Sequence, residues 1–442
     1  MHRLYLSSVA RRYTAAPTRP LSTQPEAVPS TPDRYRQGMV STHINSPTNS
    51  PIVILAGART PIGRFQGGLS SQTATDLGAV AIATAVERSG ITPEDIDFAY
   101  MGNVVAAGVG QVPARRAAAD AGIPLTVPST LLNRACLSGL HAIHLASQMI
   151  RLGEADIVVA GGMESMTNAP YLLTKARGGY RIGDGAVVDS MMTDGLTCTL
   201  EHCAMGEATE RYAADLGLTR EPQDVFAATS HERASRAHKD GLFAEEIVAV
   251  TIPQQRGEPV VVADDEGIRP DADTQSMGRL RAAFASDGNI TAGNASQISD
   301  GAAACVVTTM DRAETLGIAP LAEVVSHGQV AGPDTSLLHQ PSNAIERAVE
   351  AAGLTIGDLD LLEINEAFAA VALASMDALG VTDEIVNVNG GAIALGHPIG
   401  MSGTRITLTL AHELARRGGG LGAAGLCGGG GQGEAMVLRV AA

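Results

Sequence analysis

The sequence contains no tryptophan, and aromatic residues make up only 3% of its 442 residues. Lysine is nearly absent, with Lys175 and Lys239 as the two examples, and we attribute the preference for arginine to a GC-rich genome. No segment approaches the ~18 uninterrupted apolar residues of a membrane helix, so a membrane span is not supported. With 45% hydrophobic and 18% charged residues, the composition is that of a globular protein.

Basic residues are outnumbered by acidic ones, 31 to 47, which gives a formal net charge of −16. Without residues 1–50, which hold six arginines and two acids, 25 basic residues face 45 acidic ones, a net charge of −20. A surface this acidic argues against nucleic acid as a partner. An anionic substrate would need a local basic patch that works against the overall field.

Cysteines are few and irregularly spaced, which makes a poor disulfide framework and fits a reducing compartment. The five are Cys136, Cys198, Cys203, Cys305 and Cys427. Cys198 and Cys203 flank His202, but this spacing fits no usual zinc pattern and no second ligand pair follows. We therefore expect neither a metal nor a cofactor.

Residues 1–50 differ from the rest of the chain. They are rich in Arg, Ser, Thr and Pro and contain no acid before Glu26, as in a mitochondrial presequence. The alternative is a disordered extension, with true initiation at Met39. We favour a bacterial cytoplasmic protein, with the mitochondrial matrix as the alternative if the segment is a genuine presequence. The folded part is expected to begin near a buried strand at 52–57.

The remaining chain is long enough for two or three domains, and it repeats itself. Residues 80–103 read as a helix, a glycine stop, a short turn and an Asp-hydrophobic-Asp step before a strand. Residues 343–365 repeat this order, and the helices after Ser138-Gly139 and Ser402-Gly403 each lead to another strand. Strands that alternate with helices predict mostly parallel sheets covered on both faces.

Three segments place reactive side chains in glycine-rich backbone. They are Asn133–Leu140, which contains Cys136; Asn389–Gly400, which contains His397; and Gly425–Gly430, which contains Cys427. Such glycine density indicates tight turns or close approach of the backbone to a ligand. A cysteine at the start of a helix faces unpaired N–H groups, which predicts a lowered thiol pKa for Cys136. Together these segments resemble the thiolase family.

This resemblance implies an α/β, thiolase-like, five-layered αβαβα fold built from two duplicated halves with an inserted loop domain. The expected boundaries are 51–165 for the N-terminal half, completed by 299–319, then 166–298 for the loop domain and 320–442 for the C-terminal half. The family's loop domain is inserted in the first half, where residues 165–298 break the repeat.

The resemblance also assigns roles to five residues. Cys136 would carry the acyl group as a thioester, and His397 would accept its proton. Cys427 would exchange the proton on the α-carbon of an acyl-CoA. Gly429 would add its N–H to that of Cys136 in an oxyanion hole. Asn365, in Asn365–Phe368, would hold a water that forms a second oxyanion hole with the histidine.

Substrate contacts follow from further motif matches. Ser296, in Ala292–Ser296, matches the segment that contacts pantetheine, and Arg269 falls where the family has a basic residue near the nucleotide of coenzyme A. Met205 and Phe368 fall in family motifs and are expected to bind the substrate. Many acetoacetyl-CoA-forming members have His-Met-Gly where this chain has Ala204-Met205-Gly206, so the preference for acyl chain length stays open.

The implied activity is that of an acetyl-CoA C-acetyltransferase, which condenses two acetyl-CoA to acetoacetyl-CoA and CoA by a ping-pong Claisen reaction. The nearest alternative is a degradative 3-ketoacyl-CoA thiolase of fatty-acid β-oxidation. A non-catalytic acyl-CoA or lipid-binding homologue would be expected to have lost Cys136 or His397. Coenzyme A thioesters would be the substrates, with no nucleic acid, no membrane, and a homodimer or homotetramer as the assembly.

Overall fold

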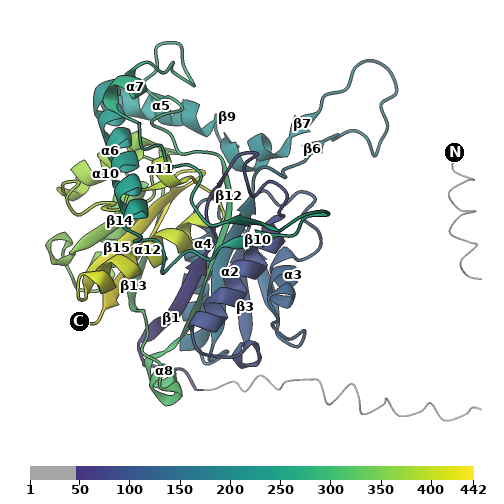
Figure 1. Cartoon of the computed structure of the whole chain (residues 1–442). Coiled ribbons are helices and arrows are strands. Elements are labelled where there is room, and N and C mark those ends of the chain that lie inside the picture. The colour runs from purple at the N-terminus through teal and green to yellow at the C-terminus, as the bar shows by residue number, and fades with distance from the viewer. Residues whose placement is uncertain (1–45) are drawn as a thin grey trace, which may run out of the picture. The chain divides into compact units, whose positions relative to one another are not determined.

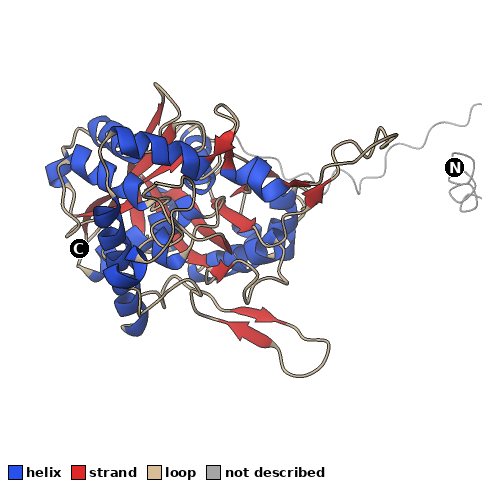
Figure 2. Cartoon of the chain, turned by 90° about the horizontal axis from the view of Figure 1, so that it is seen from above, coloured by secondary structure: helices blue, strands red, loops and turns tan. Residues whose placement is uncertain are grey.

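The computed structural model describes residues 46–442, so the extension expected over residues 1–50 lies almost wholly outside the described residues. The described chain is built around one ten-stranded sheet with helices around it (Figures 1 and 2). Its strands are β1 (Ile52–Arg59), β2 (Gly63–Arg64), β3 (Phe98–Gly102), β4 (Ser129–Leu132), β5 (Val158–Ser165), β12 (Ser299–Thr309), β13 (Ala322–Ala331), β14 (Leu361–Ile364), β15 (Gly420–Gly428) and β16 (Gln432–Val440).

The sheet consists of two similar halves joined at one point. One half has the order β4-β3-β5-β12-β1 and the other has the order β14-β15-β16-β13. They meet where β1 pairs antiparallel with β13 over three residues, from Ile52 opposite Val324 to Ile54 opposite Ala322. A single parallel bridge from Leu362 to Val386 gives the second half the edge position that β4 holds in the first. The predicted duplication is confirmed by this order.

Helices complete the five layers. α2 (Ala74–Arg88) and α3 (Pro113–Asp120) cover the outer face of the first half, and α9 (Gln340–Ala351) and α10 (Ala369–Leu379) cover that of the second. Between the two halves, α4 (Ser138–Arg151) packs directly against α12 (Ser402–Arg416). Glycines allow this approach, because a Cβ on Gly403 would lie 2.4 Å from the Leu140 nitrogen.

The repeated turns have the same structure in both halves. Short 3₁₀ turns, Pro93–Asp95 and Ile356–Asp358, precede β3 and β14. Each begins with a threonine whose N–H donates to the aspartate three residues later, at 2.8 Å for Thr92 and 2.7 Å for Thr355. The Asp-containing motif found twice in the sequence therefore forms the same local cap twice.

The expectation of mostly parallel sheets was wrong. β3 pairs parallel with β4 and β5, and β14 pairs parallel with β15, but β12 and β16 are antiparallel to their neighbours. The physical reason is the connection that each strand makes. β16 follows β15 through a hairpin at 429–431, and a tight hairpin can join only antiparallel strands.

Residues 166–298 form small elements outside the large sheet. They include three two-stranded sheets and three helices, together with a π-helical turn at Met191–Leu196. The elements are β6 (Tyr171–Leu172), β7 (Val188–Asp189), β8 (Thr197–Cys198), β9 (Cys203–Ala204), α5 (Met205–Asp215), α6 (Arg220–Lys239), β10 (Val250–Ile252), β11 (Val260–Val262) and α7 (Thr274–Gly278). Figure 1 shows α5, α6 and α7 gathered near α10 and α11 (Ala392–Leu395). The remaining helix, α8 (Met310–Leu316), packs on β1 and β12. Over the described part of the chain, no helix has both the length and the apolar character needed to cross a membrane.

Candidate active site

Cys136 lies in the short loop between β4 and α4, as the sequence predicts. The loop is held by its own side chains: the Ser138 Oγ accepts the Arg134 N–H at 2.8 Å and donates to the Ala135 carbonyl at 2.7 Å. Ala135 has a φ of +50°, a conformation that costs energy in a residue with a Cβ. The turn directs the N–H of Cys136 itself to the sulfur, and the N–H of Gly429, from the hairpin between β15 and β16, also reaches it.

The predicted lowering of the Cys136 thiol pKa was wrong for the free protein. Burial is the largest effect and raises the pKa of Cys136 to about 12, and the negative charge of Glu164 acts in the same direction. The N–H groups of Cys136 and Gly429 oppose this rise without overcoming it. Cys136 is therefore a neutral thiol at rest, and it needs a base that takes its proton as it reacts.

His397 lies in the turn between α11 and α12 and has the properties of such a base. Burial, aided by the positive charge of Arg405, lowers the pKa of His397 to about 4, so the ring is neutral at pH 7. Its Nδ1 lies 2.6 Å from the Oγ of Ser402, which donates its own proton to the Pro398 carbonyl at 3.0 Å. Because that hydroxyl proton is already engaged, Ser402 must accept from Nδ1–H. The Nε2 then carries the free lone pair, and it is buried with no partner among the described residues.

A buried carboxyl group anchors the turn that carries His397. Glu164, at the end of β5, accepts the N–H of Gly400 at 2.9 Å and the N–H of Val104 at 3.0 Å. It also accepts from the Asn103 side chain at 2.6 Å. Burial raises the pKa of Glu164 to about 7 despite these hydrogen bonds. The carboxyl group thus ties the histidine turn of the second half to β3 and β5 of the first.

Asn365 follows β14 directly and is fully buried. Its backbone N–H donates to the Gly425 carbonyl at 3.0 Å, which places it beside β15, the strand that carries Cys427. Both polar atoms of its side chain are buried and have no partner within residues 46–442. An unpaired buried amide is costly, and such groups occur where a ligand or water is bound during function.

Cys427 lies near the end of β15 in a mainly apolar cluster that also contains Met205, Phe368, Phe284 and Leu338. Burial raises the pKa of the Cys427 thiol, and the nearby Cys136 raises it further, so the two sulfurs are close enough to interact. The cluster therefore brings together the second cysteine and two of the residues predicted to bind the substrate, Met205 and Phe368.

Ser296 and Arg269, the two residues predicted to contact coenzyme A, have different positions. The Ser296 N–H donates to the Ala367 carbonyl at 3.1 Å, so its segment runs along Asn365–Phe368 at the edge of the cluster. The His397 N–H donates to the Gln297 carbonyl at 3.1 Å, which links the same segment to the histidine turn. Arg269 is exposed, and its N–H donates to the buried His231 Nδ1 at 3.1 Å. The structure thus brings Ser296 to the site and leaves Arg269 on the surface.

Two groups of side chains bear on the expectation of no metal. Cys198 and Cys203 are free thiols that face each other across the β8–β9 hairpin. His141, His327 and Glu434 place three possible ligand atoms within 4.8 Å of one another. In this second group Arg134 donates to Glu434 at 3.2 Å, so a guanidinium already lies beside the carboxylate.

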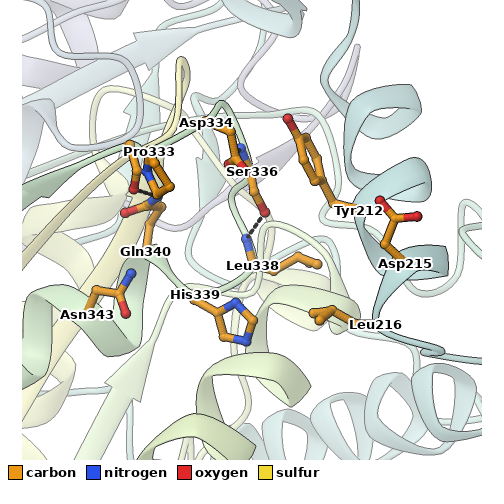
Figure 3. Close-up of a pocket in the computed structure, with 11 residues that line it drawn as sticks. Tyr212, Asp215, Leu216, Pro333, Asp334, Ser336, Leu338, His339, Gln340 and Asn343 are labelled. Atoms are coloured by element: carbon orange, nitrogen blue, oxygen red, sulfur yellow. Dashed lines mark hydrogen bonds between the residues drawn. The ribbon is translucent and has the colours of Figure 1, made fainter.

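A cavity of about 330 Å³ lies away from the reactive side chains, between α5 and residues 332–343 (Figure 3). Tyr212, Asp215 and Leu216 line one side, and His339 and Asn343 line the other. None of the predicted site residues lines it. Its wall residue Leu338 also packs in the cluster of Cys427, so the cavity backs onto the site without opening to the reactive atoms.

Comparison with known proteins agrees with this arrangement. Residues 52–311 match the thiolase N-terminal domain, and residues 318–440 match the thiolase C-terminal domain. The chain belongs to the thiolase family. A protein of Mycolicibacterium smegmatis named "Probable acetyl-CoA acetyltransferase" is 54% identical over 88% of this chain and 100% of its own length. An acetyl-CoA acetyltransferase of Cupriavidus necator is 48% identical over 88% of this chain and 99% of its own length.

A solved structure supports the fold independently. The crystal structure of the Bacillus anthracis acetyl-CoA acetyltransferase superposes with a TM-score of 0.86 at 39% identity, over 88% of this chain and 98% of that one. The predicted family, fold class and acyltransferase class are confirmed by these matches.

Three residues that shape the site were missed from the sequence: Glu164, Ser402 and Gln297. The role of Ser402 had a local signal, because it follows His397 by five residues and opens a helix. Glu164 and Gln297 act on segments far away in the chain, and nothing in their own neighbourhood identifies them.

Proposed function

We propose that this protein is an acetyl-CoA C-acetyltransferase that forms acetoacetyl-CoA and CoA from two acetyl-CoA and catalyses the reverse thiolysis. One observation carries the proposal: the half-buried thiol of Cys136 and the buried thiol of Cys427 lie near each other, beside the turn of a neutral histidine whose Nε2 is free among the described residues. One thiol can carry an acetyl group while the other exchanges a proton. The names of the relatives support the choice of acetyl-CoA.

In the first half-reaction, His397 Nε2 takes the proton of Cys136 as the sulfur attacks the acetyl-CoA carbonyl. The N–H groups of Cys136 and Gly429 hold the developing oxyanion. Cys427 is a neutral thiol because burial raises its pKa, so it can give its proton to the departing CoA sulfur. The products are free CoA, an acetyl thioester on Cys136 and a thiolate at Cys427.

In the second half-reaction, the Cys427 thiolate takes an α-proton from a second acetyl-CoA. The enolate oxygen is held by protonated His397 and by a water on Asn365, whose amide has no protein partner among the described residues. The α-carbon then attacks the acetyl thioester, and the Cys136 sulfur leaves and recovers its proton from His397. Cys136, His397 and Cys427 each recover their starting protonation state, because the α-proton of the second acetyl-CoA replaces the Cys427 proton that left with CoA, and no cofactor is required.

Initial-rate kinetics test this scheme. Thiolysis measured at several fixed CoA concentrations against acetoacetyl-CoA should give parallel double-reciprocal lines, because CoA enters only after the acetyl enzyme has formed. Lines that intersect would contradict the covalent intermediate.

The alternative, a degradative 3-ketoacyl-CoA thiolase, has one specific observation in its favour. Ala204 ends β9 next to Met205, which packs in the cluster of Cys427, so a small apolar side chain stands where many acetoacetyl-CoA-forming relatives have histidine. We therefore propose that longer acyl chains are also accepted. Rates of thiolysis for acetoacetyl-CoA and for a C8 3-ketoacyl-CoA on one purified sample decide between the two activities.

We also propose that the protein is a homodimer or homotetramer. The β6–β7 hairpin extends away from the large sheet (Figure 1), and its apolar residues Tyr171, Leu173, Ile182 and Val187 are exposed in the single chain. Exposed apolar groups in this number are typical of an interface. Light scattering of the purified protein should give a dimer or tetramer mass, and a monomer would contradict the proposal.

A further inference from the structure

The oxyanion hole is assembled from two segments that are far apart in the chain. The N–H of Cys136 comes from the β4–α4 loop, and the N–H of Gly429 comes from the β15–β16 hairpin. The loop is held by Ser138, and the Gly431 carbonyl accepts the Gly332 N–H at 2.8 Å, but Gly429 itself is loosely packed, because a Cβ there would meet nothing closer than 3.6 Å. Some contact must therefore fix the hairpin relative to the loop.

A chain of two side chains makes this connection. Arg134 lies two residues before Cys136, and its Nη2 donates to the Gln432 Oε1 at 3.3 Å. The Gln432 Nε2 donates in turn to the Gly429 carbonyl at 3.2 Å. One amide side chain thus joins the backbone of Gly429 to the loop of the nucleophile.

The Arg134 guanidinium is itself held by a buried carboxylate. Glu434 has a fully buried side chain and accepts from Arg134 at 3.2 Å. Its other oxygen lies 2.8 Å from the His141 Nδ1 and 2.6 Å from the His327 Nε2. Burial alone would raise the pKa of Glu434, but the hydrogen bonds from both histidines outweigh it and keep the pKa below its usual value. The carboxylate is therefore ionised and fixes the end of the connection.

We propose that Arg134, Gln432 and Glu434 are positioning residues that hold the Gly429 N–H against the sulfur of Cys136. The inference rests on the proposed function, because the oxyanion hole matters only if Cys136 attacks a thioester. It goes further by assigning the geometry of the hole to side chains outside the reacting groups. The link through Gln432 is the weakest point of the connection and the place to break it.

The test replaces Gln432 with methionine, which keeps the length of the side chain but removes both amide contacts. Gln329→Met is the matched control, because Gln329 also accepts from Arg134, through Nη1 at 3.2 Å, but is exposed on β13 and makes no hydrogen bond to Gly429. Acetylation of Cys136 by acetyl-CoA should be about 10-fold slower in Gln432→Met, with KM little changed, and within about twofold of wild type in Gln329→Met.

Alkylation of Cys136 by iodoacetamide gives a second readout that does not depend on acetyl transfer. A displaced Gly429 N–H stabilises the thiolate less, so the pH profile of alkylation should shift to higher pH in Gln432→Met and stay in place in Gln329→Met. If the proposed function failed, acetylation would be absent in every protein while this shift would remain. Equal alkylation profiles for the two variants would overturn the positioning role.

Gln432→Glu provides a version that keeps the contact with Arg134. The carboxylate can still accept from the guanidinium, but it cannot donate to the Gly429 carbonyl. It should show the same slower acetylation as Gln432→Met, with the melting temperature near that of wild type. Wild-type acetylation in Gln432→Glu would show that the bond to Gly429 is not needed.

Discussion

The two halves of the molecule use the same framework to hold different chemistry. Asp97 and Asp360 each precede a strand and accept an N–H from the neighbouring strand, Ile157 at 3.0 Å in one half and Leu421 at 2.8 Å in the other. When the two halves are compared through this shared contact, β3 corresponds to β14 and β5 corresponds to β15. In the resulting register Gly102 corresponds to Asn365, and Met163 corresponds to Cys427.

The helices that meet between the halves extend the comparison. Ser138 opens α4 and orders the loop that carries Cys136, while Ser402 opens α12 and orders the ring of His397. The equivalent serines thus keep their place and differ only in the group they hold. Residues that cap and pair strands are the same in both halves, whereas the reactive groups are divided, with the nucleophile in one half and His397, Cys427 and Asn365 in the other.

The sharpest test of this division removes the single reactive group of the first half. Cys136→Ser should lower acyl transfer by at least about 10³-fold, because an alcohol is far less acidic and nucleophilic than a thiol. The fold should be unchanged, as judged by the melting temperature. Cys203→Ser is the matched control, since Cys203 is a partly exposed thiol outside the pocket, and it should keep activity within about twofold.

Removing Cys427 should separate the two half-reactions. Cys427→Ala should still accept an acetyl group from acetyl-CoA, with acetylation slowed by the loss of the thiol that protonates departing CoA, yet it should fail to condense that group. The reason is that the α-proton then has no acceptor. Stoichiometric acetylation is measured by mass and condensation by the absorbance of acetoacetyl-CoA. Full condensation in this variant would end the assignment of Cys427 as acid and base.

The role of Ser402 can be broken without touching a reacting atom. Ser402→Ala removes the acceptor for Nδ1–H, so His397 loses its fixed orientation and tautomer. We expect acetylation of Cys136 to slow on the order of 10-fold to 100-fold, with KM nearly constant. Thr407→Ala on the same helix serves as the control, because its hydroxyl donates only to the Gly403 carbonyl. Equal rates for the two variants would remove Ser402 from the site.

A smaller effect is expected at the acyl pocket. Ala204→His should raise the ratio of kcat/KM values for acetoacetyl-CoA over a C8 3-ketoacyl-CoA, since one positioned polar group is typically worth ~1–3 kcal/mol. In the wild type we expect both substrates to be accepted within about one or two orders of magnitude, on that same energy scale. An unchanged ratio would show that position 204 does not set chain length.

The smallest effect concerns acid pH. Neutral His397 is the active form, and its pKa of about 4 keeps it neutral well below pH 6.5. The acetylation rate should therefore change little between pH 7 and pH 5, where about one tenth of such a group is protonated. Glu164, which anchors the same turn, has a pKa of about 7, so any fall in rate near that pH is assigned by titrating the His397 ring itself by NMR, and a ring pKa near 6.5 would contradict its burial.

Much of the fold and most of the reactive residues could be predicted because their signals are local. The Thr-x-x-Asp turns, the glycine stops and the segments around Cys136, His397 and Cys427 are short motifs whose geometry is set within a few residues. The antiparallel direction of β12 could not be predicted, because it returns to the sheet after the inserted residues 166–298. The raised thiol pKa of Cys136 was also missed, since it comes from burial by both halves and from Glu164, which is close only after folding.

The most direct test of the divided site is the location of the acetyl group. Wild-type protein and Cys427→Ala are incubated with acetyl-CoA, quenched in acid and digested. The masses of the peptides that contain each cysteine are then measured by mass spectrometry. The account predicts one acetyl group on Cys136 in both proteins, and when CoA is added the label should be lost rapidly from the wild type and much more slowly from Cys427→Ala. An acetyl group on Cys427 or on any other cysteine, or no label at all, would contradict it.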